Sequence, residues 1–226
     1  MFIGHFAVAF GAKRCAPRLS LGTLFLAAQW LDLLWPTLLL LGVERVRIDP
    51  GNTAFTPLEF VAYPISHGLL SVGIQGLLLG TLIGWLAASR RAGVVAGLLV
   101  VSHWVLDFVT HRPDLPLIPG TDLRVGMGLW NSVPVTLVVE LGVFAGALWL
   151  YLRTTAARDR AGTLGLAGLV AFLLVVYAGN VIGPPPPDTA VIAWVGQAQW
   201  LLVAWAYWID RHRLDRDASP HRSEER

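Results

Sequence analysis

Six stretches of mostly apolar residues, each nearly free of charge, follow one another along this chain. They cover residues 21 to 42, 64 to 88, 92 to 110, 131 to 152, 162 to 182 and 189 to 208. A helix rises about 1.5 Å per residue, so each stretch is long enough to cross a hydrocarbon layer roughly 30 Å thick. The apolar runs are continuous and lack the alternation of a barrel strand, so the pattern predicts transmembrane helices.

A shorter apolar segment at residues 2 to 12 precedes these stretches and ends at Lys13. It is too short to span, so we expect a half-crossing or re-entrant helix packed among the others. The predicted fold class is therefore all-α, a polytopic membrane bundle of about six transmembrane helices plus this short helix. We expect residues 1 to 209 to form a single integral membrane domain and residues 210 to 226 to form a disordered cytoplasmic tail.

Composition agrees with a membrane protein. Hydrophobic residues make up 55% of the 226, charged residues only 14%, and the mean hydropathy is +0.60. A soluble core of this size cannot bury so much apolar surface. The single cysteine, Cys15, excludes an internal disulfide framework.

The basic residues predict the topology. Thirteen of the 17 lie in alternate connections and in the tail, namely Lys13, Arg14, Arg18, Arg90, Arg91, Arg153, Arg158, Arg160, Arg211, Arg213, Arg216, Arg222 and Arg226. The intervening connections, which read as turn-rich outer loops, hold only Arg45, Arg47, Arg112 and Arg124. By the positive-inside rule this distribution places the C-terminus in the cytoplasm. The basic residues form no continuous stripe, so we expect no nucleic-acid partner.

Ionisable side chains occur inside the predicted helices, where each costs roughly 2.5 to 3.5 kcal/mol at the bilayer centre and therefore needs a partner. The first four spans contain Asp32, His67, His103, Asp107 and Glu140, and the short N-terminal segment adds His5. The last two spans contain none. Counting residues along each helix places Asp32, His103 and Glu140 near the midplane, within reach of His5, and places Asp107 and His67 nearer the outer face. We therefore expect the six to meet in one cavity in the outer half of the membrane.

The strongest local motif is His103-x-x-x-Asp107-x-x-x-His111, because residues four apart lie on one helical face, as adjacent metal ligands require. Taken alone, His103 and Asp107 fit equally well a hydrogen-bonded pair between helices. His111 lies at the outer end of the helix, which favours an interfacial or substrate-facing residue over a ligand. His67 and His5, each taken alone, are more typical of capping, interfacial or packed histidines.

Asp32 and Glu140 favour an ion, because an unpaired carboxylate near the midplane is either protonated or strongly attracts a cation. Imidazole combined with carboxylate favours Zn²⁺, with Mn²⁺ or Fe²⁺ as alternatives. A proton relay or an ion path is the other use to which these residues are suited.

At these residues the chain resembles a family of bacterial inner-membrane proteins termed metal-dependent hydrolases, also labelled LexA-binding and distantly likened to zinc-dependent phospholipase C. The resemblance covers roughly residues 1 to 112 and rests on Gly4-His5, Asp32, Ser66-His67 and His103-x-x-x-Asp107. It implies that His5, Asp32, His67, His103 and Asp107 bind metal, and that the protein lies in the cytoplasmic membrane.

The function predicted from these residues is a metal-dependent hydrolase that acts on an ester or phosphoester of a lipid or lipid-linked substrate. We expect Glu140 to act as general base, His111 as proton shuttle, and Arg112 or Arg124 to hold an anionic head group. Two alternatives belong to other classes. One is a proton- or ion-coupled transporter, and the other is a non-enzymatic regulatory partner that binds lipid or protein through its arginine-rich tail.

Overall fold

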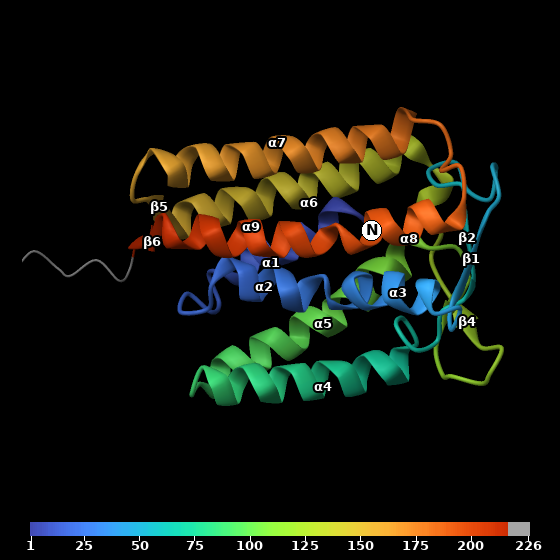
Figure 1. Ribbon diagram of the computed structural model, residues 1–226, viewed down its shortest axis with the longest axis horizontal. Helices are drawn as coiled ribbons and strands as arrows, with labels where there is room; N and C mark the ends of the chain where they lie inside the picture. The colour runs from blue at the N-terminus through green and yellow to red at the C-terminus, as the bar shows by residue number, and fades with distance from the viewer. Residues whose placement is uncertain (217–226) are drawn as a thin grey trace, which may run out of the picture.

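The computed structural model describes residues 1–216 as a bundle of helices that lie lengthwise beside one another, with short strands at both ends (Figure 1). The long helices are α4 (Leu69–Leu86), α5 (Arg90–Thr110), α6 (Val133–Thr154) and α7 (Arg160–Ile182). The last one, Thr189–Arg211, consists of α8 (Thr189–Gln197) followed by α9 (Gln199–Arg211). These five are long and apolar enough to cross a membrane. The predicted helical bundle is confirmed at this level.

The first predicted span, residues 21 to 42, is a bent pair rather than one straight helix. α2 (Leu21–Ala28) and α3 (Trp30–Leu40) meet at an angle of 55°, and together they make a sixth candidate span. The break lies at Gln29, whose backbone leaves the helical conformation. Carbonyl groups in the last turn of a helix have no partner within it. The break therefore leaves the carbonyl of Ala28 able to accept a hydrogen bond from another helix.

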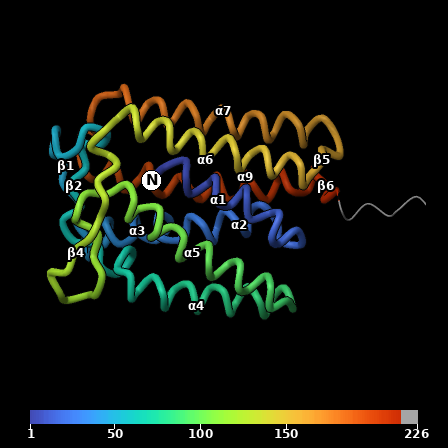
Figure 2. The backbone as a smooth tube through the Cα atoms, turned by 180° about the vertical axis from the view of Figure 1, so that it is seen from behind, coloured from blue at the N-terminus to red at the C-terminus, as the bar shows by residue number. Residues whose placement is uncertain are grey.

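The short apolar segment at the N-terminus forms α1 (Ile3–Ala12), which lies inside the bundle against α2, α5 and α6. Most of its side chains are buried, including those of Ile3, Phe6 and Phe10. At the side of the bundle, α4 and α5 form an antiparallel hairpin, seen from behind in Figure 2. α1 is thus enclosed by other helices, and this is what allows a polar residue on it to stay out of lipid.

Two of the loops predicted to be rich in turns contain short strands. β1 (Arg45–Ile48) pairs antiparallel with β2 (Leu58–Ala62), and β3 (Leu115–Pro116) pairs with β4 (Arg124–Val125). A single-turn 3₁₀ helix, η1 (Leu129–Asn131), leads into α6. We call the end of the bundle that carries these strands the hairpin end.

At the opposite end, which we call the tail end, β5 (Thr155–Ala157) pairs with β6 (Arg213–Asp215). Of the predicted tail, Asp210 and Arg211 belong instead to α9, and Arg213–Asp215 form β6. Asp210 belongs to α9 and forms an ion pair with the buried Lys13, with 3.3 Å between Nζ and Oδ1. Lys13 also pairs with Asp215 in β6 at 3.3 Å. Residues 217–226 of the predicted tail lie outside the described residues.

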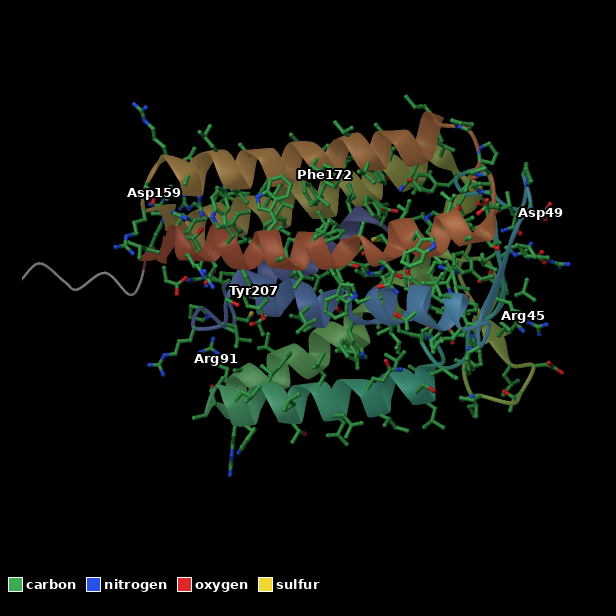
Figure 3. All side chains as sticks on the ribbon, in the orientation of Figure 1. Arg45, Asp49, Arg91, Asp159, Phe172 and Tyr207 are labelled. Atoms are coloured by element: carbon green, nitrogen blue, oxygen red, sulfur yellow. The ribbon has the colours of Figure 1, made fainter. Side chains whose placement is uncertain are left out.

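The charged residues gather at the two ends. Figure 3 shows Arg45 and Asp49 at the hairpin end, and Arg91 and Asp159 at the tail end. The α1–α2, α4–α5 and α6–α7 connections all lie at the tail end, as do the end of α9 and β6 (Figure 1). Together with the adjoining helix ends, these segments hold 11 of the 15 basic residues within residues 1–216. Two ends of unequal positive charge are what the topology prediction requires. Which end faces the cytoplasm stays a prediction.

Candidate metal centre

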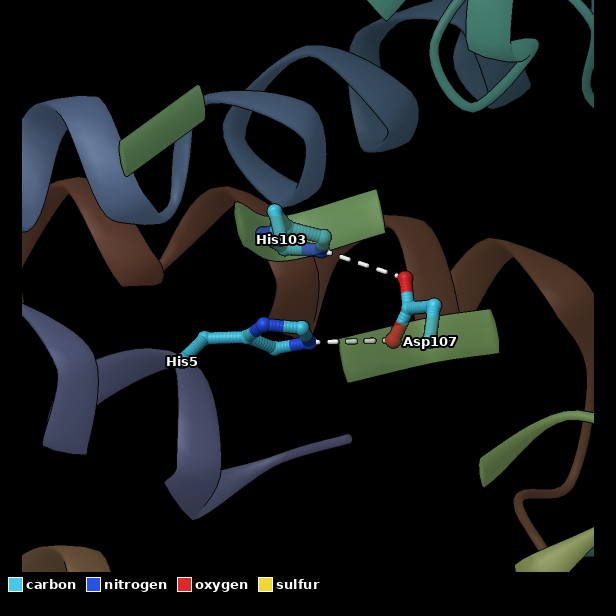
Figure 4. A group of neighbouring side chains, drawn as sticks. All are labelled: His5, His103 and Asp107. Carbon is cyan, nitrogen blue, oxygen red and sulfur yellow. Dashed lines mark hydrogen bonds and ion pairs between the residues drawn. The ribbon is translucent and has the colours of Figure 1, made fainter. Parts of the chain in front are cut away.

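α5 and α1 bring three of the predicted ligands together. His103 and Asp107 are one turn apart on α5, with 3.4 Å between His103 Nε2 and Asp107 Oδ2. His5 of α1 stacks on the ring of His103, with centroids 3.5 Å apart and planes 7° from parallel. Its Nε2 lies 3.1 Å from Asp107 Oδ1 (Figure 4). All three side chains are buried.

The other two predicted ligands meet His103 and Asp107 from the opposite side. Asp32 lies in the first turn of α3, just after the bend, and His67 lies in the loop before α4. His67 Nε2 is 3.6 Å from Asp32 Oδ1 and 3.7 Å from Asp107 Oδ2. His103 Nε2 is 3.7 Å from Asp32 Oδ2. The structure therefore brings together all five side chains for which metal binding was expected.

Two overlapping triads result, His5–His103–Asp107 and Asp32–His67–His103, and within each triad the ligand atoms lie within 4.8 Å of one another. The 3.4 to 3.7 Å separations around His67 and His103 are longer than a normal hydrogen bond. They are close to the roughly 3.3 to 3.6 Å edges of a tetrahedron whose zinc–ligand bonds measure about 2.0 to 2.2 Å. Each triad therefore has the residue types and the close spacing with which a divalent ion could be held.

The surroundings fix the orientation of His103. Its Nδ1 donates to the carbonyl of Ala28 at 2.7 Å, the group that the break between α2 and α3 exposes. Its Nε2 is buried and has no hydrogen-bond partner in the described chain. A neutral imidazole that donates through Nδ1 presents a lone pair at Nε2, which is the usual arrangement of a metal-binding histidine.

A buried carboxylate that the sequence did not reveal orients His67. Nδ1 of His67 lies 2.7 Å from Ser66 Oγ, and Ser66 Oγ donates to Glu44 Oε2 at 2.5 Å. Glu44 Oε1 also accepts the backbone N–H groups of Ile65 and Ser66, both at 2.8 Å. Because the serine hydroxyl gives its proton to Glu44, it accepts the proton of His67 Nδ1. The lone pair of His67 Nε2 then faces Asp32 and Asp107.

His111, expected to be a proton shuttle, lies beside the same cluster. Its Nδ1 donates to Asp114 Oδ1 at 2.9 Å, and its Nε2 is 4.0 Å from Asp107 Oδ1. The hydroxyl of Tyr63 donates to the same oxygen of Asp114 at 3.1 Å. Burial, together with the Asp114 carboxylate, raises the pKa of Tyr63 well above its usual range, so this hydroxyl keeps its proton. His111 is 3% exposed and packs against the rings of Phe60 and Trp130.

Glu140, expected to be a general base, is fully buried on α6, but it belongs to neither triad. Its Oε2 accepts the backbone N–H of Phe2 at 3.1 Å. That contact joins α6 to the start of α1, the helix that carries His5. The observed contact of Glu140 is therefore one that positions the helix carrying a predicted ligand, His5.

Arg112 and Arg124, expected to bind an anionic head group, lie at the hairpin end. Arg112 pairs with Glu59 and Asp114, at 3.6 and 3.4 Å. Arg124 donates to the backbone carbonyl groups of Asp114 and Val61, each at 3.3 Å. Both guanidinium groups thus bind the loops of the hairpin end, and neither side chain lines the cavity of the site.

A cavity of about 480 Å³ leads from the cluster toward the hairpin end. His5, Asp32, His67, Asp107 and His111 line its inner part. Aromatic rings line much of the rest, namely Trp35, Phe55, Phe60 and Trp130, together with the prolines 184 to 186 that follow α7. The amino group of Met1 also reaches this cavity and contacts Asp107 Oδ1.

Sequence reasoning missed Glu44 and Asp114, because acidic residues in polar loops carry no signal that separates them from ordinary surface carboxylates. Only the fold reveals that Glu44 is buried against Ser66, the partner of His67, and that Asp114 is buried against His111.

No protein-family model matches the chain, and neither a curated protein nor a solved structure is detectably similar to it. The resemblance to the hydrolase family therefore stays a prediction drawn from the residues themselves.

Proposed function

We propose that this chain is a metal-dependent hydrolase of the cytoplasmic membrane, acting on an ester or phosphoester of a lipid or lipid-linked substrate. One observation carries the proposal. Four donor groups, on Asp32, His67, His103 and Asp107, are separated by 3.4 to 3.7 Å along each measured histidine–aspartate edge. A bound divalent ion supplies Lewis-acid polarisation of the scissile group and activation of water.

The protein itself fixes the orientation and the proton positions of the two histidine donors. Ala28 and the Ser66–Glu44 pair fix the Nδ1 protons of His103 and His67, so that both Nε2 atoms are available as ligands. Asp32 is the least buried of the four, with 25% of its side chain exposed, and it lines the cavity. The donors therefore lie where an entering substrate can reach them.

The lining of the cavity supports a substrate with a large apolar part. Aromatic side chains such as Trp35, Phe55 and Trp130 make up much of the wall, and no lysine or arginine of residues 1–216 lines it. An anionic group that enters would then be neutralised at the metal centre. We accordingly expect substitution of Arg112 or Arg124 to weaken activity less than loss of a ligand.

Packing beyond the site favours an enzyme over a transporter. Toward the tail end, α1 continues from His5 through Phe6 and Phe10, whose rings pack on Phe25 at centroid distances of 5.1 and 5.2 Å. One turn further, Lys13 donates to the carbonyl of Leu19 at 2.9 Å. A dead-end cavity suits a reaction site, whereas a transport path must reach both faces of the membrane in turn.

The first test is elemental analysis of the detergent-purified protein, prepared without chelator, beside His103→Ala and Asp107→Ala. We expect at least one zinc, manganese or iron ion per wild-type chain and a loss of most of it in both variants. His212→Ala is the matched control, because His212 lies at the tail end, where it pairs with Asp159. Metal near zero in the wild type, with unchanged stability of both variants, would contradict the proposal.

The second test concerns catalysis. The wild type, loaded with Zn²⁺ or Mn²⁺ in mixed micelles, is given a fluorogenic phosphodiester and a fluorogenic carboxylic ester that carry long acyl chains. We expect the wild type to hydrolyse one of these two substrates. The rate should fall at least 100-fold in Asp107→Ala and stay unchanged in His212→Ala. pH-dependent ion flux in proteoliposomes without hydrolysis would favour the transporter instead.

A further inference from the structure

Asp107 offers its two carboxylate oxygens to two different groups of histidines. Oδ2 faces His103 at 3.4 Å and His67 at 3.7 Å. Oδ1 faces His5 at 3.1 Å and His111 at 4.0 Å. A carboxylate that serves one ion has no need of two imidazoles on each oxygen. This division is the first observation that points to more than one ion.

His103 cannot complete both triads. Its Nδ1 is committed to the carbonyl of Ala28, so only Nε2 remains as a donor. One imidazole nitrogen binds one metal ion. With Asp32, His67 and Asp107 Oδ2, His103 already makes a four-donor set of the size that zinc prefers. His5 and His111 are then left on the other side of Asp107, with their Nε2 atoms directed at Oδ1.

His111 has the surroundings of a ligand rather than those of a mobile shuttle. Its Nδ1–H is held by the carboxylate of Asp114, and Tyr63 donates to that same oxygen. The ring is buried and packs against Phe60 and Trp130, with centroids 4.7 and 4.4 Å away. A carboxylate behind a histidine is the common outer shell of a metal-binding imidazole.

From this geometry we propose a second divalent cation site formed by His5 Nε2, His111 Nε2 and Asp107 Oδ1, with Asp107 bridging two ions. The inference rests on the proposed metal centre and extends it to a dinuclear one. Two ions bridged in this way lie about 3.5 to 4 Å apart in hydrolytic enzymes, where they flank one substrate group. His111 thereby changes from the expected proton shuttle to a ligand.

One cation already meets Oδ1 in the structure, the amino group of Met1. The experiment must therefore distinguish a second metal ion from pairing with this ammonium group. Mn²⁺ is a suitable probe, because imidazole and carboxylate bind it and because two neighbouring Mn²⁺ ions give a spin-coupled electron paramagnetic resonance spectrum. An isolated Mn²⁺ ion gives an uncoupled spectrum.

Metal-depleted protein in detergent is titrated with Mn²⁺, and bound ions are counted by equilibrium dialysis and elemental analysis. We expect two ions per chain with a coupled spectrum in the wild type and in the control His212→Gln. His5→Gln and His111→Gln should each hold one ion with an uncoupled spectrum. Asp114→Asn, which leaves every proposed ligand in place, should weaken the second ion about 10-fold or more.

The outcomes separate this inference from the proposed function. One ion per wild-type chain, unaffected by His111→Gln, overturns the second site and leaves the metal centre standing. No ion in the wild type overturns both. Two ions with an uncoupled spectrum also overturn the bridge, since they would occupy separate sites. If His111→Gln fails to give a monodisperse protein, Asp114→Asn and His5→Gln decide the question.

Discussion

At the scale of single residues, two candidate ligands are each oriented by a group distant in sequence: His103 by the carbonyl of Ala28, and His67 by Glu44 acting through Ser66. His103 and Asp107 were expected to share a helix face because four residues separate them, and they do. Glu44 lies 22 residues from Ser66 in sequence, and no local pattern joins the two. Outer-shell groups of this kind follow from tertiary packing, which is why the sequence alone did not reveal them.

Glu44 allows a sharp prediction, because its charge sets the direction of two hydrogen bonds. In Glu44→Gln the new amide donates to Ser66 Oγ, the hydroxyl proton turns to His67 Nδ1, and the imidazole proton moves to Nε2. A protonated Nε2 cannot bind metal. We expect affinity for Zn²⁺ to fall about 10- to 100-fold, measured by competition with a chromophoric chelator.

The control is Glu59→Gln, which removes a carboxylate from β2 that pairs with Arg47 and lies outside the cluster. Its Zn²⁺ affinity should equal that of the wild type. Equal affinity in Glu44→Gln would show that the Glu44–Ser66 pair does not set the proton position on His67.

At the scale of elements, hydropathy predicted where the helices lie, but not the break in the first span. Residues 28 to 30 contain neither proline nor glycine, and Pro36 lies inside α3 without ending it. The bend at Gln29 is instead accompanied by a contact with α5, the hydrogen bond from His103 to Ala28. Short strands at the hairpin end were likewise beyond the pattern, because the pairs are only two to five residues long.

The hairpin of α4 and α5 depends on close backbone approach, which glycine permits. A methyl group added at Gly80 would lie 2.7 Å from the carbonyl oxygen of Gly93 and 3.1 Å from Cα of Gly97. Both are backbone atoms, so the helices must separate. We expect Gly80→Ala to lower stability by about 1 to 3 kcal/mol, seen as a lower thermal midpoint in detergent.

Gly73 on the same helix is the matched control, since a methyl group there meets nothing within 4 Å. Gly73→Ala should leave the midpoint unchanged or slightly raised, because alanine favours the helix by up to about 1 kcal/mol. Both measurements are made on metal-depleted protein, so that ion binding does not contribute. A midpoint for Gly80→Ala at or above that of Gly73→Ala would exclude tight hairpin packing.

At the scale of the whole molecule, the cavity is lined in part by helices that the sequence pattern did not connect with the site. The last two spans carry no ionisable residue at the site, as expected. Yet Gly179 and Asn180 of α7, the prolines after it, and Gln199 of α9 form one wall of the cavity. Hydropathy cannot reveal such a role, because these residues line the cavity through the path of the backbone and not through charged side chains.

The overall charge distribution predicts the direction in which the cavity opens. Cys15, the single cysteine, is exposed in the connection between α1 and α2 at the tail end, where the basic residues gather. If that end is cytoplasmic, the hairpin end and the mouth of the cavity face the other side of the membrane. A membrane-impermeant maleimide can report this directly, because the chain has no other thiol.

We expect Cys15 to react in inverted membrane vesicles and to be protected in intact spheroplasts. In a Cys15→Ser, Asp122→Cys variant the pattern should reverse, since Asp122 is exposed between β3 and β4 at the hairpin end. Labelling of Cys15 in intact spheroplasts would invert the topology. The cavity would then open to the cytoplasm, and a substrate would have to come from the inner leaflet or the cell interior, which changes the class of lipid to be tested.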